Sequence, residues 1–493
     1  RCAAQPWFGG LTNMAYGSQW QTRETAIIRG LSVRDVRFPT SHTHLWNMCH
    51  DDEECHCEDR SHDYSCAYVI AYSDIGIKGF GMVFTLGKGT DLVCEAVKHL
   101  SPILVGQELM HVFNNFASFW KKLAGQSQLK WLGPEKGVVH MALSAIVNAL
   151  WDLWGRMCDK PVWKLLLDME PEKLVSTIDF TYIEDIITPE ECVTMLKAEE
   201  GSRERREHKI LSEGYPAYSS HAGAECLSNE KMAELLDILH GQGFSRYKLK
   251  IGFEKEENIR RCKLFRDKMG WETTLILDFN QLFGVMEAIE MAKALVEFKP
   301  IWIEEPTSAD DVYGHLLVRE FLRPLGVQVA TGEHCYNRVM FKQFMINDAA
   351  DCYQVDPSRL GGINEILAVL LMGKKFNKTI IPHTGGIALC QLAQHLAIFN
   401  YVAFGTGFKE RMMEYVENMK DHFVFPLRMR RGYFIPPVNP GLSGELIEKS
   451  AKDYEYPLGR KWREMFEDKV YSNPFKDVPP YIRRCKSFLE TCQ

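Results

Sequence analysis

Six ionisable residues recur along the middle of the chain, each separated from the next by about the length of one strand and one helix. Each ends a short apolar run, and in chain order they are Lys250, Asp278, Glu304, Glu333, Asp356 and His383. If those runs are parallel strands, their carboxyl ends gather at one rim, where α/β barrels keep their chemistry. One polar residue at a strand end is ordinary, but a complete series in register predicts an active site.

Three of these residues, Asp278, Glu304 and Glu333, are carboxylates on consecutive predicted strand ends. Without a counterion they would repel one another, and the pKa of the carboxyl groups would rise. A divalent cation removes this repulsion, and an all-oxygen ligand set suits Mg²⁺ better than zinc. Each carboxylate taken singly could instead cap a helix or pair with an arginine. The three together predict one Mg²⁺ site.

The stretch RYKLKIG, residues 246–252, alternates like a strand and places Lys248 and Lys250 on one face. This predicted strand comes just before the one that ends at Asp278, so both lysines would flank the same cavity. A cation beside another cation loses its proton more easily, so we expect a lowered pKa for Lys250. A neutral lysine is a general base, whereas an isolated KxK is more often a pair of solvated lysines.

Asp356 and His383 end two further successive strands. A carboxylate behind an imidazole fixes the tautomer and supports the charged form, although such a pair alone is more often a core hydrogen bond. Here the pair would face Lys250 across the metal. Two acid–base groups on opposite sides of a cation suit removal of a proton α to a carboxylate, through an enediolate.

The elements that must position these residues fall into three regions. Residues 30–165 are predicted to form an α+β region, with a strand at 66–74 and an amphipathic helix at 137–155. From 175 to 416, short apolar runs alternate with amphipathic stretches, starting with LVSTIDF at 174–180, which predicts a closed α/β barrel. Residues 417–473 should pack back on the N-terminal region, and 1–29 and 474–493 should be loosely ordered.

Composition narrows the class of protein. The net charge of −7 over 493 residues disfavours a nucleic-acid partner, and no apolar run is long enough to predict a membrane span. The number of cysteines, 15, is odd, and Cys262, Cys352 and Cys390 sit singly in apolar runs. We therefore expect a reduced, intracellular protein, mitochondrial or cytoplasmic, and not a disulfide scaffold.

Longer stretches resemble the enolase superfamily in its mandelate racemase/muconate lactonizing branch, and within it the L-fuconate dehydratases, which include mitochondrial members of animals. Among the stretches that carry the resemblance, between about 31 and 416, are LSVRDVRFPTS, WLGPEKGVVH, ALWDLWG, GYPAY, WIEEPTS, ATGEHCYNR and RLGGINE. The resemblance implies an α+β capping domain over a modified (β/α)₇β TIM-type barrel. It also implies homo-oligomers and one Mg²⁺ on Asp278, Glu304 and Glu333.

The resemblance further implies roles for the other residues. Lys250 would remove the C2 proton, and His383 with Asp356 would help the 3-hydroxyl leave. The residues it places in contact with substrate are Lys248, Asn280, Glu414 and Tyr64. Together they imply dehydration of an acid sugar, with L-fuconate giving 2-keto-3-deoxy-L-fuconate as the expected reaction. A racemase or epimerase, or an inactive barrel that serves as a binding or regulatory module, is the alternative.

Three stretches depart from the family pattern around the expected pocket. In DFNQLF, residues 278–283, a bulky Phe279 follows the first metal ligand, and the loop SSHAGAECLSN at 219–229 lacks the usual aromatic and glycine pattern. The capping loop at 41–64 is replaced by a stretch that contains Cys49, His50, Cys55, His56 and Cys57. That loop either binds a soft metal or is a flexible acidic loop. We expect these departures to affect the choice of acid sugar and not the reaction class.

Overall fold

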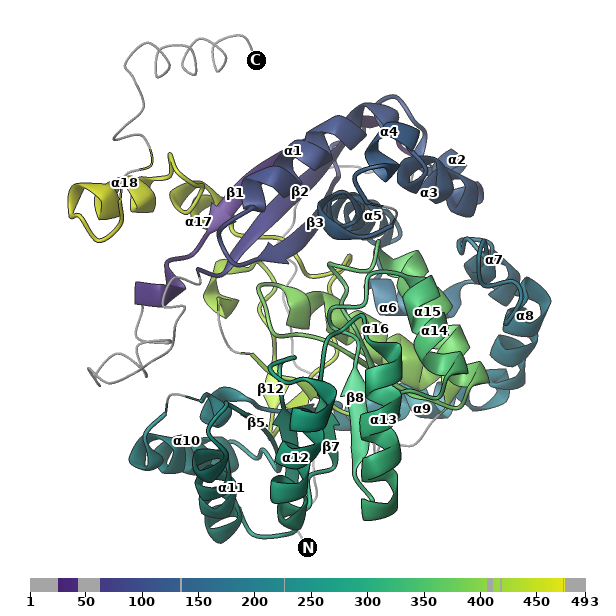
Figure 1. The fold of residues 1–493 in the computed structure, drawn as a ribbon. Coiled ribbons are helices and arrows are strands. Elements are labelled where there is room, and N and C mark those ends of the chain that lie inside the picture. Colours follow the sequence, from purple (N-terminus) through teal and green to yellow (C-terminus); the bar gives the residue numbers. More distant parts are fainter. Residues whose placement is uncertain are drawn as a thin grey trace, which may run out of the picture.

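A computed structural model describes residues 25–42, 63–133, 135–225, 227–405, 411–416, 419–472 and 474. An antiparallel sheet with its helices forms a cap, and a ring of strands and helices forms a barrel beside it (Figure 1). Segments 1–24 and 475–493, and the cysteine- and histidine-rich part of the capping loop, lie outside the described residues. The expectations about them therefore stay predictions.

The cap is built on three antiparallel strands, β1 (Ile28–Arg37), β2 (Ser65–Ser73) and β3 (Lys78–Thr85). Its helices are α1 (Thr90–Leu100), α2 (Leu109–Asn114), α3 (Phe116–Ala124), α4 (Ser127–Lys130), α5 (Gly137–Met157) and α6 (Val162–Asp168). Helix α5 packs against β2 and β3, which confirms the strand predicted at 66–74 and the helix predicted at 137–155.

Two glycines on β3 allow the close approach of α5. A Cβ atom at Gly79 would lie 2.1 Å from the carbonyl oxygen of Ala149, and one at Gly81 would lie 2.0 Å from that of Ala145. Among the described residues α5 alone is long and apolar enough to cross a membrane, yet 78% of its most apolar window is buried inside the fold. Its apolar length is thus explained by the core of the cap.

The barrel strands follow one another in chain order. They are β4 (Tyr215–Tyr218), β5 (Arg246–Lys250), β6 (Thr274–Asp278), β7 (Trp302–Glu304), β8 (Gln328–Thr331), β9 (Cys352–Val355), β10 (Thr379–Pro382) and β11 (Met413–Glu414). Strands β5 to β10 form one parallel sheet, β4 joins β5 through a bridge between Ser219 and Tyr247, and β11 pairs in parallel with β4. The predicted α/β barrel with a separate cap is confirmed.

Helices alternate with these strands and surround them (Figure 1). They are α10 (Asn229–Gly241), α11 (Lys255–Met269), α12 (Val285–Leu295), α13 (Val312–Leu322), α14 (Arg338–Ile346), α15 (Ile363–Lys375) and α16 (Leu389–Phe404). Each helix returns the chain so that the next strand runs in the same direction, and the carboxyl ends of all strands therefore meet at one rim.

The first barrel strand predicted from sequence, at 174–180, is wrong. Leu174 and Val175 end helix α7 (Pro171–Val175), and turns follow them. Helices α8 (Pro189–Ala198) and α9 (Glu200–Glu213) then occupy the chain until β4 begins at Tyr215. Leu174, Val175 and Ile178 are buried, but a short apolar run does not distinguish a strand from a buried helix end.

The C-terminal segment contacts both the barrel and the cap. Strands β12 (Met429–Arg430) and β13 (Tyr433–Phe434) extend the sheet from β4. Helices α17 (Glu448–Asp453) and α18 (Arg460–Glu467) follow, and the indole nitrogen of Trp462 donates a hydrogen bond of 3.0 Å to the Arg37 carbonyl at the end of β1. The segment thereby joins the two parts of the molecule.

Candidate active site

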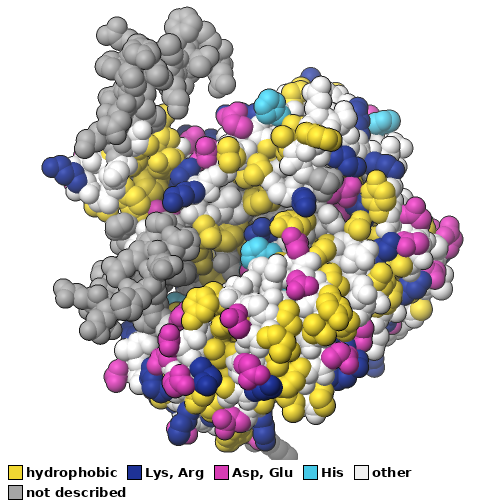
Figure 2. Space-filling model, in the orientation of Figure 1, with side chains coloured by type: hydrophobic (Ala, Val, Ile, Leu, Met, Phe, Trp, Pro, Cys, Tyr) yellow, Lys and Arg dark blue, Asp and Glu magenta, His cyan; other side chains and the backbone are white. Residues whose placement is uncertain are grey.

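The predicted polar residues collect at the carboxyl ends of the barrel strands. Lys250, Asp278, Glu304 and Glu414 are the last residues of β5, β6, β7 and β11. Asp356 and His383 directly follow β9 and β10, and Glu333 lies two residues beyond β8. Figure 2 shows histidine and acidic side chains at a recess between the cap and the barrel. The rim predicted from spacing therefore exists.

Lys248 is the centre of a buried charge cluster. Its Nζ lies 2.9 Å from Glu304 Oε1 and 3.3 Å from both Asp278 Oδ2 and Glu414 Oε2. Burial alone would lower the pKa of Lys248, but Glu304 and Glu414 outweigh burial and raise it. Lys248 is thus a fixed cation that links three strand ends.

Lys250 lies on the open side of the same cluster. Its Nζ is 2.5 Å from Asp278 Oδ2, and 34% of its side chain is exposed. Burial and Lys248 both lower the pKa of Lys250, as expected from sequence, but Asp278 and Glu333 outweigh them and raise it. The predicted lowering of this pKa is therefore wrong for this arrangement, because carboxylates outnumber ammonium groups around Lys250.

Asp278 and Glu304 are fully buried carboxylates. The backbone N–H of Asn280 donates 3.0 Å to Asp278 Oδ1, and the indole of Trp302 donates 3.3 Å to Glu304 Oε2. Burial and the charge of Asp278 raise the pKa of Glu304, which is the repulsion expected between neighbouring carboxylates. An excess of buried oxygen anions is a donor set that fits a divalent cation such as Mg²⁺.

His383 is held by a carboxylate on each side. Its Nδ1 lies 2.7 Å from Asp356 Oδ2, and its Nε2 lies 3.5 Å from Glu333 Oε2. The other oxygen of Asp356 accepts backbone N–H groups from Ser358 and Arg359, which fixes the carboxylate. Burial lowers the pKa of His383, but Glu333 and Asp356 outweigh it and raise it to about 9. The imidazole is oriented with one nitrogen toward the site.

Tyr64 comes from the cap and the other predicted contacts from the barrel. The Tyr64 ring is buried edge-on to Phe84, with ring centres 5.2 Å apart, and burial together with the charge of Glu414 raises its pKa. Glu414 accepts a hydrogen bond from Ser220 in the altered loop 219–229. That loop therefore reaches the site.

Phe279, which follows the first predicted metal ligand, packs into the hydrophobic core. Its side chain is fully buried in the main hydrophobic core, 5.3 Å from the ring of Phe283. It follows Asp278 and packs among apolar side chains, and Phe283 is itself part of that core. The DFNQLF departure is thus accommodated as core packing.

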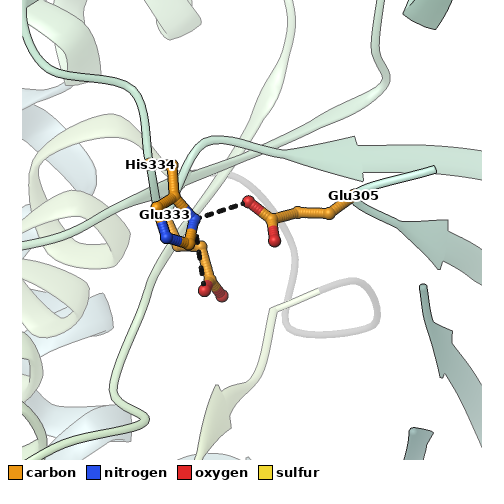
Figure 3. Close-up of side chains that lie close together, drawn as sticks. All are labelled: Glu305, Glu333 and His334. Atoms are coloured by element: carbon orange, nitrogen blue, oxygen red, sulfur yellow. Dashed lines mark hydrogen bonds and ion pairs between the residues drawn. The ribbon is translucent and has the colours of Figure 1, made fainter. Parts of the chain in front are cut away.

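Three residues that the sequence did not single out also belong to the site. His334 Nδ1 lies 2.9 Å from Glu305 Oε1 and 3.5 Å from Glu333 Oε1 (Figure 3). The amide nitrogen of Gln281 lies 3.0 Å from the same Glu305 oxygen. Two of these residues could have been found from the sequence, because each is an ionisable residue that directly follows a predicted metal ligand. Glu305 follows Glu304 in WIEEP, and His334 follows Glu333 in GEH, but only the strand ends were considered.

Two protein-family models match the chain, one in the region of the cap and one in the region of the barrel. Residues 61–166 match the model described as mandelate racemase/muconate lactonizing enzyme, N-terminal domain. Residues 231–450 match the model described as enolase C-terminal domain-like. The matches cover most of the cap and of the barrel.

Two related sequences and one crystal structure align with this chain over nearly their whole length. "Mitochondrial enolase superfamily member 1" of Xenopus laevis is 44% identical over 449 residues, 90% of this chain and 99% of the relative. "L-galactonate dehydratase" of Hypocrea jecorina is 43% identical over 437 residues, 88% of this chain and 95% of the relative. The crystal structure of human mitochondrial enolase superfamily member 1 superposes with a TM-score of 0.85 at 43% identity, covering 90% of this chain and 99% of that one.

Proposed function

The chain belongs to the enolase superfamily, in its mandelate racemase/muconate lactonizing branch, and from that premise we propose that it is a Mg²⁺-dependent dehydratase of acid sugars, a hydro-lyase. The observation that carries the proposal is the placement of two proton-transfer groups on the same rim. Lys250 ends β5 beside Asp278, and His383 follows β10 beside Glu333. Relatives named as dehydratases of acid sugars agree with this reaction class.

Asp278, Glu304 and Glu333 would hold the cation. Enolase-superfamily sites use Mg²⁺ with a lysine or histidine base, and the ion supplies positive charge for the substrate carboxylate as its α-proton is removed. Lys248 adds a fixed positive charge at the end of the cavity where Glu304 and Glu414 lie. Asn280, Glu414 and Tyr64 would contact the bound sugar.

Lys250 and His383 would divide the proton transfers between them. Lys250, on the open side of the charge cluster, would act as the neutral amine that accepts the proton from the carbon next to the carboxylate, because a cation on Asp278 and Glu333 would offset the negative charge that raises its pKa. His383 would give a proton to the departing 3-hydroxyl, with Asp356 behind it to stabilise its charged form. Loss of water from C2 and C3 leaves an enol that becomes a 2-keto-3-deoxy acid.

L-Fuconate is the proposed substrate, and L-galactonate is the first compound to compare with it. L-Fuconate is 6-deoxy-L-galactonate, so the two acids share every stereocentre and differ by one hydroxyl at C6. A relative named L-galactonate dehydratase therefore supports a pocket for this configuration and leaves the preference at C6 open to measurement. The names of the relatives also support a mitochondrial location.

The test is formation of 2-keto acid from L-fuconate, L-galactonate and other acid sugars with Mg²⁺, for the wild type, Lys250→Met and Lys255→Met. Lys255 is an exposed lysine at the start of α11 and serves as the control. We expect turnover that falls roughly 10²- to 10⁴-fold in Lys250→Met only. Inversion at C2 without a keto acid would support an epimerase, and no turnover of the whole panel would refute the dehydratase.

A further inference from the structure

The pair formed by Glu305 and His334 repeats the chemistry of Asp356 and His383 on the other side of Glu333. One oxygen of Glu333 lies 3.5 Å from His383 Nε2, and the other lies 3.5 Å from His334 Nδ1. Each imidazole has its own carboxylate behind it, Asp356 at 2.7 Å and Glu305 at 2.9 Å. The proposed chemistry uses the first pair and leaves the second without a role.

Three consecutive barrel loops are shaped to hold His334 in place. Gln281, in the loop after β6, donates to Glu305 in the loop after β7, and its amide oxygen accepts the backbone N–H of Ala309. Asn280, Gln281 and Glu305 have left-handed φ values of 45°, 62° and 43°. Such backbone conformations are strained for residues other than glycine and gather at functional sites. Glu305 is also almost fully buried, which adds to the cost of the arrangement.

The arrangement is a hydrogen-bonded pair and not a second metal site. Ligand atoms of Glu305, Glu333 and His334 lie within 4.8 Å of one another, a spacing that a cation could use. However, Nδ1 of His334 is already 2.9 Å from Glu305 and 3.5 Å from Glu333 (Figure 3). Nδ1 also lies 3.0 Å from the amide nitrogen of Gln281, so this nitrogen is already engaged, and Nε2 is the nitrogen left for another partner.

The accessible part of the His334 ring can contact a hydroxyl group. The side chain is 39% exposed although Glu305 beside it is almost fully buried, so part of the ring remains open to a ligand. A sugar hydroxyl can donate to a neutral Nε2 or accept from a protonated one, so this contact forms in either protonation state. Glu333 separates the two imidazoles, so the hydroxyl at His334 differs from the one that His383 serves.

We propose that His334 is a specificity-determining residue whose Nε2 edge hydrogen-bonds a hydroxyl of the bound acid sugar other than the departing one, while Glu305 and Gln281 fix its orientation. This inference rests on the proposed function, because it assumes an acid sugar in the recess. It adds a substrate contact on the loop after β8 to those expected on β5, the loop after β6, β11 and the cap.

The test compares His334→Asn with His334→Gln and the control His240→Asn. Asparagine keeps a donor near the position of Nδ1 for Glu305 but removes the Nε2 edge, whereas glutamine reaches toward the Nε2 position. His240 is an exposed residue of α10. Binding of L-galactonate with Mg²⁺ is measured by calorimetry in the Lys250→Met background, which removes turnover. We expect His334→Asn to weaken binding about tenfold, the worth of one hydrogen bond, and His334→Gln to restore part of it.

The outcomes separate this inference from the proposed function. Weaker binding in His334→Asn with Mg²⁺ affinity unchanged supports the contact, even if the wild type turns over no acid sugar. Equal binding by His334→Asn and the control overturns the inference, even if the wild type is an efficient dehydratase. A loss of Mg²⁺ affinity in His334→Asn, or no binding of the acid sugar in the Lys250→Met background, also overturns it.

Discussion

At the scale of single residues, the pKa of each ionisable group in the site depends on the balance between its burial and the charges of its neighbours. Two lysines lie among carboxylates from several strand ends, and these carboxylates outweigh burial, so the pKa of both Lys248 and Lys250 is raised. His383 has the same balance, since Glu333 and Asp356 outweigh its burial. The charge state of each group thus depends on neighbours that come from different strands.

Replacement of His383 by asparagine should separate the two proton transfers. Lys250 contacts Asp278 on β6, whereas His383 contacts Asp356 and Glu333, so removing the imidazole leaves the environment of Lys250 in place. We expect dehydration to fall roughly 10²- to 10⁴-fold while the C2 proton still exchanges in D₂O. Proton NMR of L-fuconate measures both, with His240→Asn as the control. Loss of exchange together with dehydration would contradict separate roles.

At the scale of elements, the fit of α5 on β3 depends on two positions without side chains. At Gly81 a Cβ atom would meet the backbone of α5 at 2.0 Å, which neither element can relieve by a side-chain rotation. Gly30, on β1 of the same sheet, has nothing within 4 Å of such an atom. Gly81 and Gly30 are both strand glycines of the cap sheet, so alanine substitutions at the two positions can be compared.

Gly81→Ala should destabilise the cap, and Gly30→Ala should not. Overpacking of a core typically costs about 1–3 kcal/mol, and here the clash is with backbone. We expect a lower midpoint of thermal unfolding for Gly81→Ala and a midpoint within error of the wild type for Gly30→Ala. Equal midpoints for the two variants would show that α5 shifts freely on the sheet.

A buried ion cluster around Arg338, at the start of α14, also connects several elements. The guanidinium lies 2.9 Å from Glu135 in the cap, 3.1 Å from Asp179 and 3.0 Å from Glu365 on α15. Burial raises the pKa of Glu365 from 4.5 to about 7, because Arg338 offsets only part of the penalty. Ionisation of Glu365 therefore opposes folding near neutral pH.

The pH dependence of stability should change in Glu365→Gln. Because the folded pKa is above the unfolded one, the contribution of Glu365 is fully present below pH 4.5 and is lost as the pH rises to about 7, by roughly 3 kcal/mol in all. The amide does not titrate. The unfolding midpoint of Glu365→Gln minus that of the wild type should therefore rise from pH 5 to pH 8. Glu290→Gln on α12, at a side chain that is 66% exposed, is the control.

At the scale of the whole molecule, the sequence was sufficient for whatever depends on local pattern. The strand-end residues were predicted because each ends an apolar run, and the barrel was predicted from the alternation of these runs with amphipathic stretches, whereas the capping domain was implied by the family resemblance. The strand predicted at 174–180 is wrong because a run that short has no period, and its first two residues end helix α7. The sign of the Lys250 pKa shift was missed because the prediction considered the neighbouring lysine and not the carboxylates on the adjacent strand ends. The Glu305–His334 pair was missed because its two residues lie in loops that meet only in the fold.

The cap and barrel meet where Phe84 of β3 covers Gly386, which follows β10. A Cβ atom at Gly386 would lie 2.4 Å from the Phe84 ring, and Phe84 in turn packs on Tyr64, a predicted substrate contact.

Gly386→Ala should therefore displace the ring and disturb Tyr64, raising KM for the acid sugar several-fold with little effect on kcat. Gly444→Ala is the control in the same interface, because its nearest neighbour is the flexible end of Leu392 at 3.3 Å. Steady-state kinetics of both variants on L-fuconate make the comparison. An unchanged KM in Gly386→Ala would mean that the cap–barrel contact does not position the substrate-binding residue of the cap, and a raised KM in both variants would mean that any loosening of the interface does so.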